Sequence, residues 1–465
     1  MEKWNRGLGH LFMTIFLHNY SAFMVIPAIT DVTMSALCPG RDECSIAIYL
    51  TGFQQAIIGL GTLVMTPFVG KLSDKYGRKA LLTIPLTFTG IPLGILAYSR
   101  TKSFFYLYYV FKTLIAMVCE GSVHCLAFAY LADNVPEGRR ASAFGILSGI
   151  SSCGFVCGTL STRFLSTSST FQVAALVSIA AVVYMRVFLP DTIIDDNLSV
   201  PILSKVKLGV SESDQGSSKK GRFLKSLPSP NGMVALLKTS PTLLQAGIVA
   251  FFSNLAEVGL HASMMYFLKA EFHYNKDQFA DLMVISGIAG TISQLLLMPI
   301  LAPLLGEERL LSIGLLFSTS HVSTNPSESS PSDSIALNYT CDIMFLYGVA
   351  WSFWVPYAAA MFSIISVFAQ PCMRSIVSKQ VGSREQGKAQ GCISGICSLA
   401  NVVSPLAFSP LTALFLSDNA PFDFPGFSIM CTGFSSMIAF IQSMMISAVP
   451  PIASHRISNC NHMEP

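Results

Sequence analysis

Charged residues are scarce in this sequence. Asp, Glu, Lys and Arg together make up 12% of its 465 positions, against about 25% in ordinary soluble domains. The sequence also lacks the motifs of common phosphate-binding, zinc-protease and dithiol sites, which are Gly-x-x-x-x-Gly-Lys-Ser/Thr, His-Glu-x-x-His and Cys-x-x-Cys. The first absence excludes a soluble globular domain, and the second leaves no constellation of residues that would support an enzyme. We therefore predict a protein that is not an enzyme and has no cofactor and no bound metal.

Apolar residues are correspondingly abundant. They make up 52% of the chain, and the mean hydropathy is +0.56. They fall in repeated runs of about 20 residues, the length that crosses a hydrocarbon core of about 30 Å. Lipid cannot satisfy backbone polar groups, so each run must be a helix. We predict an all-α membrane protein with twelve transmembrane helices, at 8–29, 46–69, 80–99, 104–131, 141–163, 171–190, 241–268, 277–301, two within 309–376, 388–416 and 426–450.

Lysine and arginine are unevenly distributed between the predicted loops. If both termini are cytosolic, 22 of the 29 Lys and Arg residues lie on the cytosolic side. This is the bias that membrane insertion favours, so we expect cytosolic termini. The net charge of +3 then reflects topology and gives no reason to expect nucleic-acid binding. Which membrane holds the protein is not predicted; the plasma membrane and an endomembrane such as the vacuolar one both fit.

The chain divides into two halves that resemble each other. Residues 191–240 are rich in Ser, Gly, Pro and Lys and predict a flexible cytosolic linker between an N-terminal half, 1–190, and a C-terminal half, 241–465. The stretches VPEGRRASAFGILSGISS (135–152) and VGSREQGKAQGCISGICS (381–398) share seven of eighteen positions at a constant offset of 246. Each enters the fifth predicted helix of its half. Two pseudo-symmetric six-helix bundles are typical of transporters that hold a substrate between them.

A dense charge cluster, GKLSDKYGRK at 70–79, separates the second and third predicted helices. It resembles the signature loop of the major facilitator superfamily. AYLADNVPEGRRASAFG, at 129–145, is similar to the drug:proton antiporter and tetracycline-efflux branch and to the hippocampus-abundant-transcript-like proteins. The resemblance implies a cytosolic gating motif formed by Gly70, Leu72, Asp74, Gly77, Arg78, Lys79, Asp133 and Arg140.

By this resemblance, Asp74 would bind the start of the eleventh helix, at 387–391, and Arg78 would pair with Asp133. The chemistry agrees, because a carboxylate neutralises the positive N-terminal end of a helix and a guanidinium forks onto a carboxylate. The alternative is that these charges only anchor the loop in the cytosol. The counterpart in the second half, 304–314, lacks the Asp-x-x-Gly-Arg core, so we expect an asymmetric latch.

The fifth predicted helix carries Gly154 and Gly158, a spacing that permits close helix packing. Antiporters of the superfamily usually have a Gly-Pro pair and a terminal Gly-Gly pair there. This chain has Thr159 where the proline stands. Uptake, facilitated diffusion and antiport therefore all remain open.

Polar residues within the predicted helices are functional candidates, because an ionisable group in lipid costs several kcal/mol. We favour Glu120 and Glu257, since a buried carboxylate can take up and release a proton. In the alternative, Glu120 and Lys112 form a purely structural pair. The full set of candidates for proton coupling or substrate contact is His18, Asn19, Lys112, Glu120, His124, Asn254, Glu257, His261 and Gln370.

Two further segments stand apart from this pattern. The polar segment 318–342 interrupts the ninth predicted helix. Removing it leaves two runs of apolar residues that are each long enough to span, so we predict an insertion. Cys38 and Cys44 lie in the first non-cytosolic loop, and a disulfide or two free thiols fit equally well.

The sequence therefore predicts a secondary active transporter of a small organic solute, coupled to protons, working by alternating access as a monomer in a lipid bilayer. A uniporter without proton coupling, and a non-transporting protein of the same fold such as a receptor or an inactive variant, are the alternatives. The sequence does not predict the solute.

Overall fold

The computed structural model describes residues 2–37, 45–191, 237–238, 240–274, 276–319, 352–382, 385–416, 420–422 and 424–446. In these ranges the regular elements are all helices. Eleven of them are long and apolar enough to span a membrane. Cys38, Cys44, most of the predicted linker and residues 320–342 of the predicted insertion lie outside the described ranges, so those expectations stay predictions.

The N-terminal helices are α1 (Glu2–Leu37), α2 (Ser45–Tyr76), α3 (Arg78–Tyr98), α4 (Lys102–Cys119), α5 (Ser122–Asn134), α6 (Arg140–Ser161) and α7 (Thr167–Phe188). A short 3-10 turn, η1 (Glu137–Arg139), precedes α6. The C-terminal helices are α11 (Pro241–Phe272), α12 (Lys276–Ile292), α13 (Met298–Leu305), α14 (Glu307–Thr319), α16 (Val355–Ser366), α17 (Ala369–Lys379), α18 (Gln386–Phe415) and α19 (Phe427–Met444). A π-helical turn, η2 (Ser293–Leu297), joins α12 to α13.

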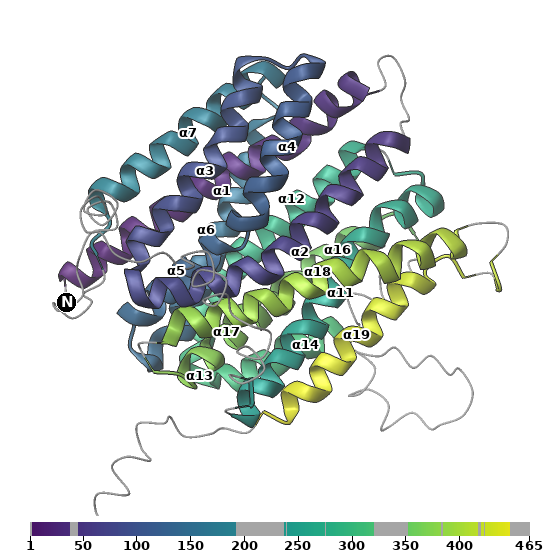
Figure 1. Ribbon diagram of the computed structural model, residues 1–465. Helices are drawn as coiled ribbons and strands as arrows, with labels where there is room; N and C mark the ends of the chain where they lie inside the picture. Colours follow the sequence, from purple (N-terminus) through teal and green to yellow (C-terminus); the bar gives the residue numbers. More distant parts are fainter. Residues whose placement is uncertain are drawn as a thin grey trace, which may run out of the picture.

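The two groups of helices meet along two seams. In Figure 1, α3 and α7 lie on one side of the molecule and α14 and α19 on the other, with α2 running beside α18 between them. The second seam brings α6 against α12, η2, α13 and α17. Each seam joins the second helix of one half to the fifth helix of the other.

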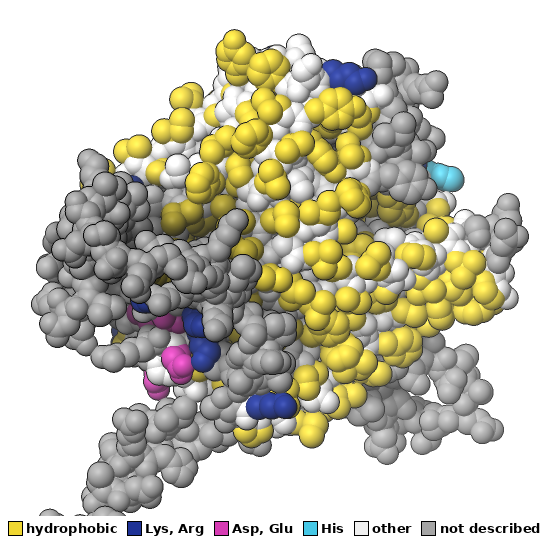
Figure 2. Space-filling view, viewed as in Figure 1, with side chains coloured by type: hydrophobic (Ala, Val, Ile, Leu, Met, Phe, Trp, Pro, Cys, Tyr) yellow, Lys and Arg dark blue, Asp and Glu magenta, His cyan; other side chains and the backbone are white. Residues whose placement is uncertain are grey.

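The surface has the pattern expected in lipid. On the face shown in Figure 2, hydrophobic side chains cover most of the described surface, and charged side chains lie toward the ends of the helices. Leu176, Ile179, Val183 and Val187 follow helical spacing on α7 and are each more than half exposed. A helix with its large apolar residues outward is stable only in an apolar solvent.

Two predicted spans are broken, contrary to the sequence analysis. The fourth span ends as α4 at Cys119 and resumes as α5 at Ser122, with Gly121 at φ 83° between them. The tenth divides into α16 and α17 around Val367 and Phe368. Glu120 and Gly121 plus the repeat offset of 246 give 366 and 367, so the two breaks are equivalent in the repeat. The candidates Lys112, Glu120 and His124 would share one face of a continuous helix, but the break at Gly121 places His124 on a separate helix.

The ninth span is described only in part. α14 has 13 residues, too few to cross a bilayer alone. Its continuation at 320–351 lies outside the described residues, which is why the described spans number eleven and not the expected twelve.

Candidate functional site

The charge cluster at 70–79 folds as the end of α2, a turn and the start of α3. Gly77 makes the turn with φ 90°, a backbone conformation that a residue with a Cβ rarely adopts. Asp74, in the last turn of α2, therefore lies one helical turn from Arg78, which begins α3. The Arg78 Nη2 lies 2.6 Å from Asp74 Oδ1, and the Arg78 side chain is only 4% exposed.

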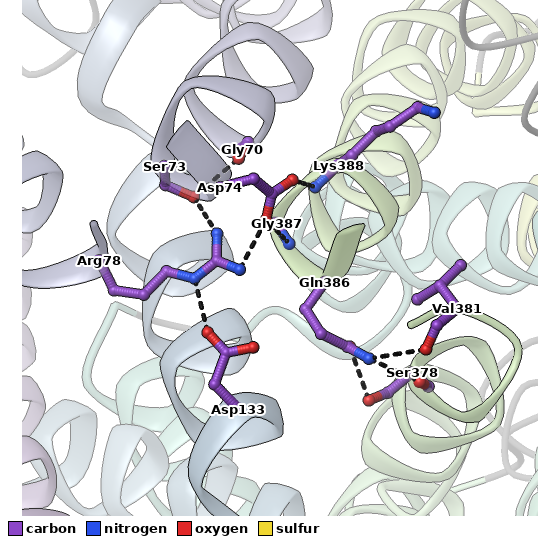
Figure 3. A network of polar contacts seen from close by, with 10 residues as sticks. All are labelled: Gly70, Ser73, Asp74, Arg78, Asp133, Ser378, Val381, Gln386, Gly387 and Lys388. Carbon is purple, nitrogen blue, oxygen red and sulfur yellow. Dashed lines mark hydrogen bonds and ion pairs between the residues drawn. The ribbon is translucent and has the colours of Figure 1, made fainter. Parts of the chain in front are cut away.

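Asp74 also bridges the two halves of the protein. Its Oδ1 accepts a hydrogen bond from the backbone N–H of Gly387, and its Oδ2 accepts one from Lys388, both at 2.8 Å. These amides lie in the first turn of α18, where N–H groups have no partner within the helix. Figure 3 shows the carboxylate directed at the two amides.

Arg78 completes the network on the N-terminal side. Its Nε donates to Asp133 Oδ2 at 2.8 Å, and its Nη1 donates to Ser73 Oγ. Two carboxylates surround one guanidinium, so this group carries one net negative charge. The positive end of α18, equivalent to about half an elementary charge, partly balances it. We call Ser73, Asp74, Arg78, Asp133, Gly387 and Lys388 the latch network, and its side of the molecule the latch end.

Close backbone approach makes the latch possible. A Cβ on Gly70 would collide with the carbonyl oxygen of Gly387, and a Cβ on Gly387 would collide with Gly70 O, Ser73 Oγ and Arg78 Nη1. Glycine at both positions therefore lets α2 touch the start of α18, as helices do where small residues face each other.

A second contact joins the halves at the latch end. Arg140, at the start of α6, donates from Nη1 to the carbonyl of Ser378 at 3.0 Å and from Nε to Val135 O at 3.2 Å. Gln386, 246 positions later, donates from Nε2 to the same Ser378 carbonyl at 2.8 Å and to Val381 O at 3.1 Å. The two residues repeat one role at equivalent positions.

The counterpart loop at 304–314 is less degenerate than its sequence indicates. Gly306 makes the same turn, with φ 80°, and Glu307 begins α14 as Arg78 begins α3. Glu307 Oε1 lies 2.8 Å from Lys379 Nζ, and Lys379 is the repeat equivalent of Asp133. Burial raises the pKa of the Glu307 carboxyl, an effect that the neighbouring Lys379 ammonium opposes. The ion pair of the first half is thus present in the second with its charges reversed.

The asymmetry expected from the sequence concerns the contact between halves. Asp74 lies three residues before the turn glycine Gly77, and three residues before the turn glycine Gly306 stands Pro303, which has no carboxylate. There α13 packs against α6, and Met298 lies where a Cβ on Gly145 would stand. At the latch end the first seam is thus closed by a carboxylate on backbone amides, whereas α6 and α13 meet there through apolar packing. The second seam has polar contacts elsewhere, from Arg140 to Ser378 O and from Ser152 Oγ to Gln294 Oε1 at 3.2 Å.

The predicted interior candidates fall into two groups. In the first, Lys112 Nζ lies 3.7 Å from Glu120 Oε2 beside the break in the fourth span, with both side chains 42–50% exposed. His18 on α1 lies close enough to His124 and Lys112 for their charges to interact. Asn19 is buried, and its Nδ2 has no hydrogen-bond partner among the described residues.

The second group lies between α11 and α18. Asn254 Nδ2 donates to Cys397 O at 3.0 Å and to Asn401 Oδ1. Glu257 and His261 follow on α11 and are both exposed in the protein alone. Glu257 makes no ion pair with any described residue. Gln370 lies in the first turn of α17, just beyond the break in the tenth span.

Gly154 and Gly158 bring α6 onto α1. A Cβ on Gly154 would lie 3.2 Å from the Phe16 carbonyl oxygen, and one on Gly158 would lie 2.7 Å from that of Tyr20. Both neighbours are backbone atoms, so these two glycines serve the close packing that their spacing predicts.

The match to known families decides the identity of the fold. The family model of the Major Facilitator Superfamily matches residues 11–405. The chain belongs to the major facilitator superfamily. The human organic anion transporter MFSD10 (TETRAN) has a similar solved structure, with a TM-score of 0.73 at 16% identity over 95% of this chain and 99% of that one.

Sequence relatives within the superfamily are distant. The bovine (Bos taurus) hippocampus abundant transcript-like protein 1 is 24% identical over 370 residues, which cover 79% of this chain and 64% of that protein. The chain thus spans just under two thirds of the length of this relative. Multidrug resistance protein 2 of Bacillus subtilis (strain 168) is 24% identical over 388 residues, or 82% of this chain and 84% of that protein.

Sequence reasoning missed one interior charge, Arg374. The distribution of Lys and Arg predicts a cytosolic position for it, but it lies on α17 within the tenth span and contacts both halves. Its presence in an apolar run, and its position 246 residues after Phe128, are the signals that could have identified it. Glu307 was missed because its motif is unrecognisable once the charges are reversed.

Proposed function

We propose that this major facilitator superfamily protein is a secondary active transporter of a small organic solute that works by alternating access. The observation that carries the proposal is the pair of hydrogen bonds from Gly387 and Lys388 to Asp74. They join the halves at the latch end through contacts that water can replace when the halves separate. A seam of this kind can close and open without leaving a buried charge unpaired.

The proposal includes the topology. The N-terminal half, 1–190, and the C-terminal half, 241–465, rock against each other about the linker 191–240, as monomers, with both termini and the latch end in the cytosol. The excess of Lys and Arg on that side supports this orientation. Contacts at α2–α18 and α6–α17 then close the cytosolic side. At the opposite end the exposed ion pair of Arg163 and Asp281 also joins the halves, and this pair would have to open for the solute to enter from that side.

Proton coupling is the finer part of the proposal. Glu257 has no ion-pair partner in the described part of the chain, and Asn254, one turn away, is bonded to α18. The proton affinity of the Glu257 carboxylate can therefore change when a movement of α11 against α18 changes how much water reaches it. Glu120 is the second candidate, at the break in the fourth span. The names of the multidrug resistance and organic anion transport proteins similar to this chain support an organic solute.

Flux measurement in proteoliposomes tests both levels. Solute accumulation driven by a proton gradient is expected in the wild type and is expected to be lost in Glu257→Gln or Glu120→Gln. Glu271→Gln, at the end of the same helix as Glu257, is the matched control and is expected to transport normally. Solute flux that does not depend on the proton gradient would indicate a uniporter and would refute proton coupling. Absence of flux for every solute of a broad panel would refute transport.

A further inference from the structure

Arg374 is a charge within a membrane span that the latch does not use. It lies on α17, five residues before Lys379 and six after Phe368, or about 8 Å and 9 Å along the helix axis at 1.5 Å per residue. It is half-buried. It therefore sits between the latch end and the break of the tenth span, where a permanent positive charge is expensive unless something compensates it.

The described residues supply hydrogen bonds to Arg374 but no counter-charge. Its Nη1 donates to Gln390 Oε1 at 3.1 Å and to Ser394 Oγ at 3.2 Å, both on α18. Its guanidinium carbon lies 4.6 Å from the centre of the Phe128 ring on α5. Among the described residues it takes part in no ion pair, whereas the latch arginine, Arg78, pairs with two carboxylates.

Part of the guanidinium remains available. Nε and Nη2 make no hydrogen bond within the described chain, and neither is among the buried atoms without a partner. Because Arg374 is only half-buried, these two nitrogens can bind a group that is not part of the described chain. Nε and Nη2 form one edge of the planar guanidinium, the edge that accepts a carboxylate or phosphate with two parallel hydrogen bonds.

No described carboxylate forms an ion pair with Arg374. Its charge acts on His124 and Cys125 on α5 and on Cys397 on α18. Two carboxylates act on the same cysteines: Asp74, which is paired with Arg78, and Glu257, which makes no ion pair with any described residue. Phe128 is the repeat equivalent of Arg374, so their contact places the guanidinium where the two halves meet. A transporter of this architecture holds its solute at the interface between its halves, near the bilayer midplane. Arg374 lies at that interface, on the side toward the latch end.

We infer that Arg374 binds an anionic group of the transported solute, a carboxylate or another oxyanion, through its Nε–Nη2 edge. This inference rests on the proposed function, because it names the charge of the solute. Gln390 and Ser394 hold the other terminal nitrogen and so orient the free edge. Phe128 covers the guanidinium face and excludes water from it.

The competing role is a structural clamp, in which Arg374 joins the halves through Phe128 and binds no solute. Phe128→Leu separates the two roles. It removes the cation–π contact and leaves the charge and the free edge. If Arg374 is the anion site, Phe128→Leu keeps anion binding within about threefold. If Arg374 is only a clamp, Phe128→Leu and Arg374→Gln have the same effect.

Thermal stability of the purified full-length chain in detergent provides the test. The probes are acetate, succinate, benzoate, inorganic phosphate and sulfate, with acetamide, succinamide and benzamide as neutral partners. At least one anion is expected to raise the melting temperature of the wild type where its neutral partner does not. Arg374→Gln should weaken that response at least tenfold in anion concentration, Arg374→Lys should retain part of it, and Arg186→Gln, an exposed charge at the end of α7, should retain all of it.

Two results would overturn the inference. One is that no anion raises the melting temperature of the wild type more than the corresponding amide does. The other is an anion response that survives Arg374→Gln, or that Phe128→Leu abolishes equally. If Arg374→Gln does not purify as a folded protein, phenylglyoxal labelling of Arg374 in the wild type replaces it; anions should slow the labelling and their amides should not, and equal labelling rates would overturn the inference. Anion binding without transport of any solute would refute the proposed function and leave this inference standing. Transport of a neutral solute at an unchanged rate in Arg374→Gln would refute only this inference.

Discussion

Asp133 and Lys379 occupy equivalent positions at the ends of the fourth and tenth spans, and they carry opposite charges. Asp133 pairs with Arg78 at the start of α3, and Lys379 pairs with Glu307 at the start of α14. Both halves therefore have an ion pair at this place, but the positive residue begins the third span in the first half and ends the tenth span in the second. The two pairs differ in one respect: Asp74 adds a third charge to the first pair, whereas the second has no counterpart of Asp74.

Because of this difference, we expect that reversing both charges of a pair is tolerated at Glu307 and Lys379 but not at Arg78 and Asp133. Glu307→Lys and Lys379→Glu should each lower the melting temperature by several degrees, because breaking a buried pair costs about 3 kcal/mol or more. The double variant, with the pair reversed, should recover most of that loss. Arg78→Asp with Asp133→Arg should recover little, since the new aspartate would face Asp74. Thermal melts of the six variants decide this, and equal recovery in both pairs would contradict the assigned role of Asp74.

A second prediction concerns the latch. Asp74→Asn removes the charge and leaves one acceptor oxygen for two backbone donors. The loss of a charged hydrogen bond costs about 2 kcal/mol, which shifts the equilibrium toward separated halves by about 30-fold. Accessibility of a cysteine introduced at Ser394 to a thiol reagent applied from the latch end, in a background without the native cysteines, should rise accordingly. Lys75→Gln, an exposed neighbour on α2, is the control and should change nothing.

The third prediction concerns the contact of α6 with α1. Gly158→Ala should destabilise the protein by about 1–3 kcal/mol, because the new methyl group meets backbone atoms that cannot move aside. Gly94→Ala is the matched control. Gly94 lies within α3 with nothing within 4 Å of a Cβ, and alanine is the better helix former by about 0.5–1 kcal/mol. A Gly158→Ala variant as stable as Gly94→Ala would show that α6 and α1 are less closely packed than described.

A fourth prediction separates the two interpretations of Glu120. If the carboxylate carries protons, Glu120→Gln should abolish proton-driven accumulation, while Lys112→Gln should weaken transport and keep its dependence on the proton gradient. If Glu120 and Lys112 form only a structural pair, both substitutions should lower thermal stability to a similar degree and leave the proton dependence intact. Flux at several proton gradients, measured beside a thermal melt, distinguishes the two.

Much of this architecture is predictable from sequence because lipid imposes simple rules. Apolar runs of spanning length must be helices. The partners of the signature at 70–79 are predicted from its resemblance to a family. The chemistry agrees with that resemblance, because the N-terminus of the helix after 385 has unpaired backbone donors for Asp74 and the fourth span ends in a carboxylate, Asp133, for Arg78.

The remaining features follow from packing that a single sequence does not display. Glu120 and Gly121 stand in a run with normal apolar periodicity, so the sequence of the fourth span alone does not predict its break. The structure shows the break there and at the equivalent position of the tenth span. Arg374 was counted as one more cytosolic charge because its Phe128 and Ser394 contacts come from distant segments. Glu307 and Lys379 escaped notice because reversing both charges preserves an ion pair and erases its motif.

Two distances measured in the same molecules by double electron–electron resonance would test whether the latch controls alternating access. Spin labels at Lys75 and Glu385 report on the latch end, and labels at Phe164 and Phe353, both more than half exposed, report on the opposite end. The twelve native cysteines would first be replaced. Alternating access predicts that Asp74→Asn lengthens the first distance and shortens the second. Distances unchanged by Asp74→Asn, or lengthening at both ends together, would contradict a latch that controls alternating access.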